Sequence, residues 1–195
     1  IKLRGNKSFL EEPLNEIDEL IFSHLSYIDF ETSSEGLSIF DAYKQSKSNK
    51  IDKNIRPYLW ARMGSHKTYE YAQNSHRFKD IILVHQINII SEQQRTQFSA
   101  TCFKVSNQQY CIAFRGTDET VIGWQEDLML CYQEEIPAQR YAKEYLEKTL
   151  RLFEGSFYLS GHSKGGNLAI YAGCNQQTTL QSRIVSIRNY DGPGF

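Results

Sequence analysis

Hydrophobic residues near the start of the chain recur at helical spacing. In "PLNEIDELIFSHLSYIDF", residues 13–30, they stand three or four positions apart, which places them on one side of a helix. These apolar positions are Leu14, Ile17, Leu20, Ile21, Leu25 and Ile28. Asn15 and Asp18 stand where a cap and a first-turn negative charge are favourable. The pattern predicts an amphipathic helix that buries this apolar side.

Two further helical patterns precede residue 80. "LSIFDAYKQS", residues 37–46, predicts a short helix, and "RPYLWARM", residues 56–63, predicts another with Pro57 near its start. Between them, residues 44–54 are polar and rich in lysine, which is typical of a solvated loop. We therefore expect residues 1–79 to form a mainly helical part.

Short apolar runs begin at residue 80. Residues 80–90 fit either a strand or the end of a helix. The β-rich runs "TQFSATCFKV" (96–105) and "QYCIAFRG" (109–116) are separated by a few polar residues. That arrangement predicts a hairpin of two antiparallel strands.

Helical and strand patterns then alternate to the end of the chain. Helices are predicted over 138–154 and 164–174, and strands over 156–161 and from 183. Such alternation predicts an α/β fold with a mostly parallel sheet and flanking helices. The hairpin adds an antiparallel edge. We expect one domain, residues 1–195, with the sheet in residues 80–195.

Composition narrows the class of protein. The 195 residues are 40% hydrophobic and 23% charged, as in ordinary globular domains. The net charge of −1 provides no basic surface, which argues against nucleic acid as a partner. No run approaches the roughly 18 apolar residues of a membrane span. We expect a cytoplasmic protein, although the first residue, Ile1, leaves a removed signal open.

The four cysteines do not have the spacing of a metal site. They are Cys102, Cys111, Cys131 and Cys174. Each lies among apolar residues, so we interpret them as small buried thiols, with a disulfide or a reactive thiol as the alternative. We expect neither a metal nor a cofactor.

A serine between two glycines carries the main chemical signal. In "GHSKGG" Ser163 has Gly161 two positions before it and Gly165 two positions after it, with His162 and Lys164 between. The motif lies between a strand and a helix, as in a nucleophile elbow, where a Cβ at either glycine position would clash. The Lys164 amide would then face a developing oxyanion. An ordinary serine in a glycine-rich turn is the alternative; the phosphate-loop pattern is absent.

A second motif supplies a candidate partner for that amide. In "CIAFRGTDETVIGWQEDL", Thr117 follows the end of a predicted strand and offers an amide and a hydroxyl to an oxyanion hole. The alternative is that Thr117 caps a turn. We interpret Arg115 as structural, paired with Asp118 or Asp127. Trp124 either lines the site or packs, and we favour packing.

These motifs resemble those of a known family. "FRGT" followed by "WQEDL" and then "SGHSKGG" is similar to the class 3 lipases, the family of the fungal triacylglycerol lipases. The longer pattern, ending in "NYDGPGF", resembles a bacterial branch of α/β-hydrolases related to those lipases. The resemblance covers most of the chain. It implies an α/β-hydrolase fold, Ser163 as nucleophile, and Thr117 with the Lys164 amide as oxyanion hole. It implies no substrate.

An activated serine also needs a base and an acid. No histidine follows Ser163, and the side chain of the adjacent His162 is expected to point away from it. Asp191 ends the last predicted strand and is a candidate acid, although we interpret "DGPGF" mainly as a turn near the site. We expect the acid and the histidine of the triad beyond Phe195, so that residues 1–195 alone are nearly inactive.

The leading hypothesis is a serine hydrolase acting on a small-molecule ester or an acyl lipid. The alternative is a binding or interaction module on a hydrolase scaffold that has lost catalysis. A cysteine- or metal-dependent enzyme is a third, weaker reading, because the residues lack ligand spacing. No feature of the sequence indicates contact with a membrane surface or an oligomeric state.

Overall fold

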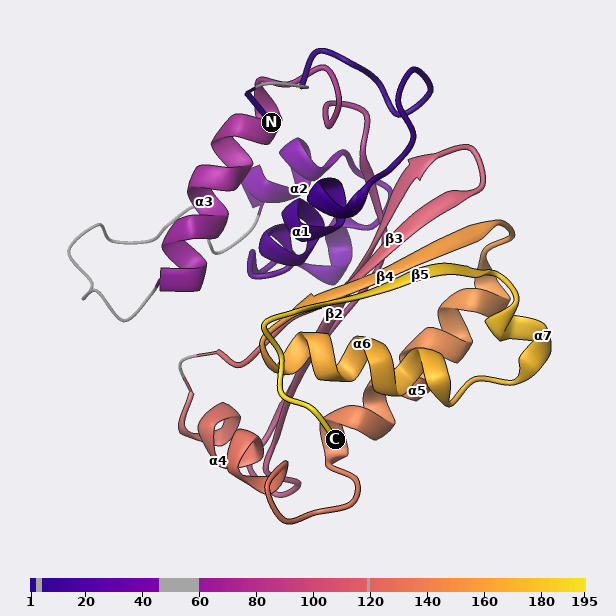
Figure 1. Ribbon diagram of the computed structural model, residues 1–195. Helices are drawn as coiled ribbons and strands as arrows, with labels where there is room; N and C mark the ends of the chain where they lie inside the picture. Colours follow the sequence, from indigo (N-terminus) through magenta and orange to yellow (C-terminus); the bar gives the residue numbers. More distant parts are fainter. Residues whose placement is uncertain (3–4, 46–59, 119) are drawn as a thin grey trace.

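The computed structural model describes residues 1–2, 5–45, 60–118 and 120–195 (Figure 1). Most of the polar segment 44–54 and Pro57 lie outside these residues. The described elements follow one another in this order: α1 (Glu16–Leu25), the 3-10 helix η1 (Thr32–Ser34), α2 (Ile39–Gln45), α3 (Trp60–Gln73), β1 (Ile82–Ser91), β2 (Thr96–Ser106), β3 (Gln109–Phe114), α4 (Val121–Met129), α5 (Pro137–Leu152), β4 (Ser156–His162), α6 (Lys164–Cys174), α7 (Thr178–Gln181) and β5 (Ile184–Tyr190).

The strands form a mixed sheet in the order β1-β2-β3-β4-β5. Strands β1, β2 and β3 pair antiparallel, whereas β3, β4 and β5 pair parallel. The predicted hairpin is confirmed, and so is the helix–strand alternation after it. The expectation of a mostly parallel sheet is wrong, because the ambiguous run 80–90 forms strand β1. It returns to β2 through the short turn at 92–95 and therefore pairs antiparallel.

Helices cover both faces of the sheet. Figure 1 shows α1, α2 and α3 on one face, and α5 and α6 on the other. Strand β3 is buried on both sides and alternates between two cores. Tyr110, Ile112 and Phe114 pack with α5 and α6, and Cys111 and Ala113 pack with the N-terminal helices. The end of β3, where the candidate site begins, is therefore held from both faces.

Helix α1 begins where the sequence predicts but turns a different side to the core. The Asn15 side chain accepts hydrogen bonds from the first-turn amides, as expected of a cap. Ile17 and Leu20, however, are 56% and 40% exposed, whereas Asp18 and Glu19 are buried. The predicted apolar stripe is thus partly wrong. The reason is that both buried acids find polar partners on other elements, which hydrophobic spacing does not reveal.

Arg77 is the partner of Asp18. Its Nε and Nη2 atoms lie 2.8 and 2.5 Å from the two carboxylate oxygens, and both side chains are buried. The remaining guanidinium hydrogens are donated to backbone carbonyls of Lys7, Ser8, Glu12 and Pro13. One planar guanidinium thereby fastens the N-terminal segment to α1.

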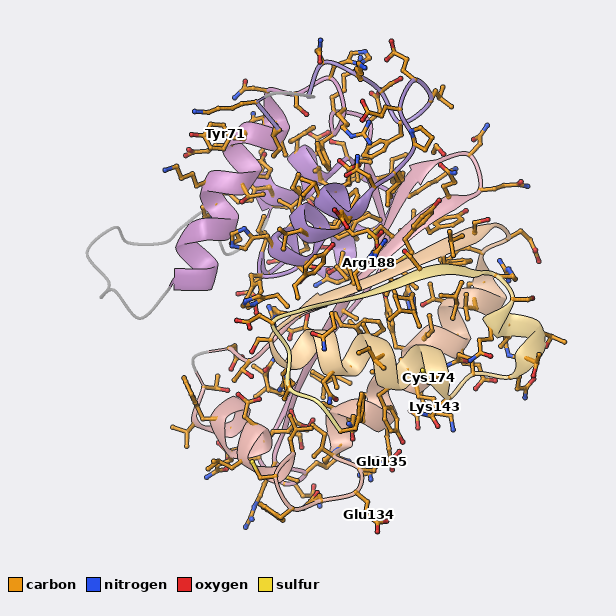
Figure 2. The ribbon with its side chains drawn as sticks, in the orientation of Figure 1. Tyr71, Glu134, Glu135, Lys143, Cys174 and Arg188 are labelled. Atoms are coloured by element: carbon orange, nitrogen blue, oxygen red, sulfur yellow. The ribbon has the colours of Figure 1, made fainter. Side chains whose placement is uncertain are left out.

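Glu19 is the second buried acid and connects α1 to the edge strand β5. Its carboxylate accepts a hydrogen bond of 2.9 Å from the Ser186 hydroxyl. Arg188, labelled in Figure 2, lies on β5 with its Nε 3.8 Å from the same carboxylate. Burial raises the pKa of Glu19, and the Ser186 hydrogen bond and the Arg188 charge oppose that rise only in part.

This raised pKa predicts how Glu19→Gln changes stability with pH. Below the ordinary carboxyl pKa, Glu19 is protonated in both the folded and the unfolded states. As the pH rises above the ordinary pKa, the unfolded state ionises first, because ionisation of the folded state would place a poorly hydrated charge in the interior. The wild type therefore loses stability until the pH has passed the folded-state pKa. Glutamine avoids this loss. We expect the free energy of unfolding of Glu19→Gln, relative to wild type, to increase from about pH 4 to about pH 7.

Urea unfolding at several pH values measures this difference. Glu144→Gln, a change at an exposed glutamate, is the matched control and is expected to show little trend. A Glu19→Gln difference that stays constant or falls with pH would contradict the argument.

Candidate active site

Ser163 occupies a strained turn between β4 and α6. Its φ of 55° and ψ of −134° lie where non-glycine residues are rarely found, at a cost of about 1–3 kcal/mol. Two hydrogen bonds hold this backbone: the Ser163 amide donates to the Tyr190 carbonyl at 2.9 Å, and the Gly166 amide donates to the Ser163 carbonyl at 2.8 Å. Ser163 is partly exposed, so the turn is not sealed from solvent.

The two flanking glycines allow three backbone segments to touch. A Cβ on Gly161 would lie 2.1 Å from the Gly165 carbonyl oxygen. A Cβ on Gly165 would lie 2.1 Å from the carbonyl oxygen of Phe114, the last residue of β3. Strand β4, helix α6 and strand β3 therefore meet at a point where only glycine fits.

The loop after β3 lies directly against this turn. A Cβ on Gly116 would lie 2.6 Å from the His162 carbonyl oxygen and 3.3 Å from the Cβ of Ser163. Thr117, the next residue, is partly exposed. The fold thus brings the Gly116–Thr117 loop beside Ser163 and Lys164, although helices α4 and α5 and strand β4 lie between them in the sequence.

Thr117 uses its hydroxyl for a different purpose from the one expected. Its Oγ1 donates to the Asp127 carboxylate, with both carboxylate oxygens 2.6 Å away. A hydroxyl has one proton to donate, so only the Thr117 amide remains for an oxyanion. Burial raises the pKa of Asp127, while the Thr117 hydrogen bond and the Lys164 charge act against that rise.

The Lys164 side chain points into the protein and is buried. Its Nζ lies 2.8 Å from a Glu126 carboxylate oxygen, 2.8 Å from the Gln97 carbonyl oxygen and 3.1 Å from the Gln97 side-chain oxygen. All three ammonium protons are therefore donated, one of them to a carboxylate. A lysine held in this way has no lone pair with which to act as a base, and its backbone amide remains the candidate oxyanion donor.

Tyr27 brings the N-terminal part of the chain to the site. Its hydroxyl lies 3.0 Å from Nδ1 of His162, and a Cβ on Gly116 would lie 2.3 Å from the same hydroxyl. Burial raises the pKa of Tyr27 to about 12, although the Arg115 charge and a backbone hydrogen bond from Gly116 oppose the rise. The hydroxyl is consequently neutral at ordinary pH. No signal in the sequence singled out Tyr27.

Arg115 is structural, but its partners differ from those predicted. Its guanidinium lies 2.5 Å from the Asp29 carboxylate and 2.8 Å from the Asn88 side-chain oxygen. Asp118 instead accepts from the amide and hydroxyl of Thr120, the cap of α4. The predicted pairing of Arg115 with Asp118 or Asp127 was local in sequence, whereas the fold supplies partners from the N-terminal part and from β1.

The "DGPGF" turn after β5 packs on the serine turn. A Cβ on Gly192 would lie 2.4 Å from the Ser163 carbonyl oxygen, and the Gly192 amide donates to the Asn189 side chain at 2.8 Å. Asp191 is exposed, with a left-handed φ of 55°. Its role as an acid stays a prediction.

The histidine positions do not change the expectation for the base. His24 contacts Thr68, His85 contacts Thr149 in the sheet–helix interface, and His162 contacts Tyr27. The location of the base beyond Phe195 stays a prediction.

Helix α4 carries an exposed apolar side next to the site. Val121, Trp124 and Leu128 are 72%, 64% and 66% exposed, and their spacing places them on one side of the helix. The expectation that Trp124 packs is therefore wrong. The side of α4 that faces the protein instead carries Gly123, Glu126 and Met129, all of them buried.

The cysteines divide into two buried and two exposed residues. Cys102 and Cys111 are buried as expected, whereas Cys131 and Cys174 are exposed, contrary to expectation. Within residues 1–2, 5–45, 60–118 and 120–195, no cluster of three or more histidine, cysteine or acidic side chains is placed to hold a metal ion. In those same ranges no helix combines the length and apolar character needed to cross a bilayer.

A known family and solved structures are similar to this chain. The model of the Mbeg1-like family matches residues 72–195. The structure of a lipase called M37 is similar with a TM-score of 0.47 and 19% sequence identity, over 92% of this chain and 60% of that one. A fungal lipase in complex with an inhibitor is similar with a TM-score of 0.37 and 16% identity, over 50% of this chain and 42% of that one. The chain thus spans less than two thirds of either lipase. None of the curated proteins compared with the chain matches it.

The crowding at the serine turn predicts the effect of Gly165→Ala. The new Cβ would overlap the Phe114 carbonyl, which is backbone and has little freedom to move. We expect the free energy of unfolding to fall by at least about 1–3 kcal/mol. Gly194→Ala is the matched control, because a Cβ there meets nothing within 4 Å. Thermal or urea unfolding measures both, and wild-type stability in Gly165→Ala would contradict the steric argument.

Proposed function

This chain belongs to the Mbeg1-like family, and we propose that it is a serine hydrolase that cleaves esters through an acyl-enzyme on Ser163. One observation carries the proposal. Ser163 is held at a strained, partly exposed strand-to-helix turn, with the Gly116–Thr117 loop packed against it. Strain of this kind persists where the surrounding structure maintains it, commonly at functional sites.

In the proposed reaction the Ser163 hydroxyl attacks the ester carbonyl carbon. A base takes the hydroxyl proton, and the carbonyl oxygen becomes an oxyanion that accepts from the amides of Thr117 and Lys164. Collapse of this intermediate expels the alcohol, which takes up the proton, and leaves an acyl-enzyme. Water then attacks the acyl-enzyme and releases the carboxylic acid. Following the chain order of α/β-hydrolases, we place the acid and the histidine base after Phe195.

We propose that the acyl group is apolar, as in an acyl lipid or a small hydrophobic ester. The exposed side of α4 supports this, because Val121, Trp124 and Leu128 stand next to the loop that carries Thr117. An apolar side chain there gains by covering a hydrocarbon chain from water.

Covalent labelling tests the proposal most directly. The full-length protein expressed from its natural gene is treated with a fluorophosphonate, and its intact mass is measured. We expect one adduct in wild type, none in Ser163→Ala, and one in the control Ser182→Ala, whose exposed serine precedes β5, whereas Ser163 contacts the end of that strand. Hydrolysis of a p-nitrophenyl ester is expected to fall by at least about 10³-fold in Ser163→Ala.

The opposite result has an equally clear meaning. A folded wild-type protein that takes up no adduct and hydrolyses neither short-chain nor long-chain esters would overturn the hydrolase proposal. The chain would then be a binding module on a hydrolase scaffold.

A further inference from the structure

Two consecutive acids of α4 each contact one half of the proposed oxyanion hole. Asp127 accepts from the Thr117 hydroxyl, and Glu126 accepts from the Lys164 ammonium. Thr117 follows β3 and Lys164 follows β4 by way of Ser163, so the two candidate amides belong to different loops. Helix α4 contacts both residues, Thr117 through Asp127 and Lys164 through Glu126.

The Glu126 carboxylate is fully buried and fully bonded. One oxygen accepts from the Thr96 hydroxyl at 2.6 Å and the Ala138 amide at 2.9 Å. The other accepts from the Gln97 amide at 3.0 Å and the Lys164 ammonium at 2.8 Å. Ala138 lies in the first turn of α5, where the helix dipole favours a negative charge. Glu126 therefore joins α4 to β2, α5 and α6 at a single point.

Such a pair is a costly way to obtain stability alone. Removing two charges from water costs free energy that their attraction only partly returns, and well-packed apolar residues often serve stability as well. A fully hydrogen-bonded ion pair also fixes the orientation of its two side chains, because each hydrogen bond constrains an angle as well as a distance.

This constraint acts on Lys164, the residue whose backbone amide is the proposed oxyanion donor. Lys164 is the first residue of α6 and follows the strained Ser163. Three hydrogen bonds hold the end of its side chain, and the backbone that carries this side chain is the first turn of α6. An oxyanion donor must be aimed in advance at the place where charge develops.

We propose that Glu126 is a positioning residue, which through Lys164 holds the oxyanion amide in place while Asp127 holds Thr117. Helix α4 thereby sets the spacing of the two donors. This inference rests on the proposed function of Ser163. It assigns a role to the acidic pair in "WQEDL" and to the lysine in "GHSKGG", two motifs that the chemistry of the serine alone leaves unexplained.

The test compares Lys164→Met and the double variant Glu126→Gln/Lys164→Met with wild type, in the full-length protein. Both variants keep the backbone amide and remove the tether. The double variant leaves no unpaired buried charge, so it is the second variant to measure if the single variant unfolds. We expect kcat for a p-nitrophenyl ester to fall about 10²-fold, with KM changed less than about twofold.

A second measurement separates positioning from folding. An alkyl boronic acid forms a tetrahedral adduct with the serine, whereas the product carboxylic acid binds without one. We expect affinity for the boronic acid to fall in parallel with kcat and affinity for the product to stay unchanged. The control is Asp18→Asn, which weakens a different buried ion pair, with Arg77, whose further hydrogen bonds go to the N-terminal segment. It is expected to lower the unfolding midpoint but to keep kcat per folded molecule.

Two outcomes would overturn the inference, and they differ. A folded double variant with wild-type kcat and wild-type boronic acid affinity would show that the pair serves stability alone, while the hydrolase proposal stands. A wild-type protein that neither hydrolyses the ester nor takes up a fluorophosphonate would remove the hydrolase proposal and this inference with it.

Discussion

The meeting of three backbone segments at Gly161 and Gly165 is the constraint on which the site depends. Strand β4, helix α6 and the end of β3 approach so closely there that a Cβ on either glycine would overlap a carbonyl group. This approach forces Ser163 into its left-handed conformation and presses Gly116 against the same turn. The strained conformation of Ser163 and the position of the adjacent loop thus have the same steric cause.

Buried and partly buried acidic residues connect the elements around this point. Asp18 and Glu19 tie α1 to the N-terminal segment and to β5, whereas Glu126 and Asp127 tie α4 to the loops beside Ser163. Each carboxylate has a specific donor, as burial of a charge requires. These four carboxylates therefore each join α1 or α4 to another part of the fold.

Local patterns predicted the elements well and their partners poorly. Periodicity and glycine positions predicted the hairpin, helices α5 and α6, and the alternation of helices and strands after β3. These features are properties of short segments. The apolar stripe of α1 was only partly right, since burial of Asp18 and Glu19 depends on Arg77 and β5. Strand β1, which adds a second antiparallel pair to the sheet, was left open between strand and helix, because an apolar run of that length suits either.

The sequence by itself determined the strand–serine–helix motif, because the two glycines and the serine are neighbours in the chain and their steric role is local. Tertiary structure alone decided what surrounds Ser163. Tyr27, the Asp29 partner of Arg115, and the pairing of Glu126 with Lys164 all join residues far apart in sequence. Such contacts form only when the sheet is assembled, since it is the packing of β3 beside β4 that brings their loops together.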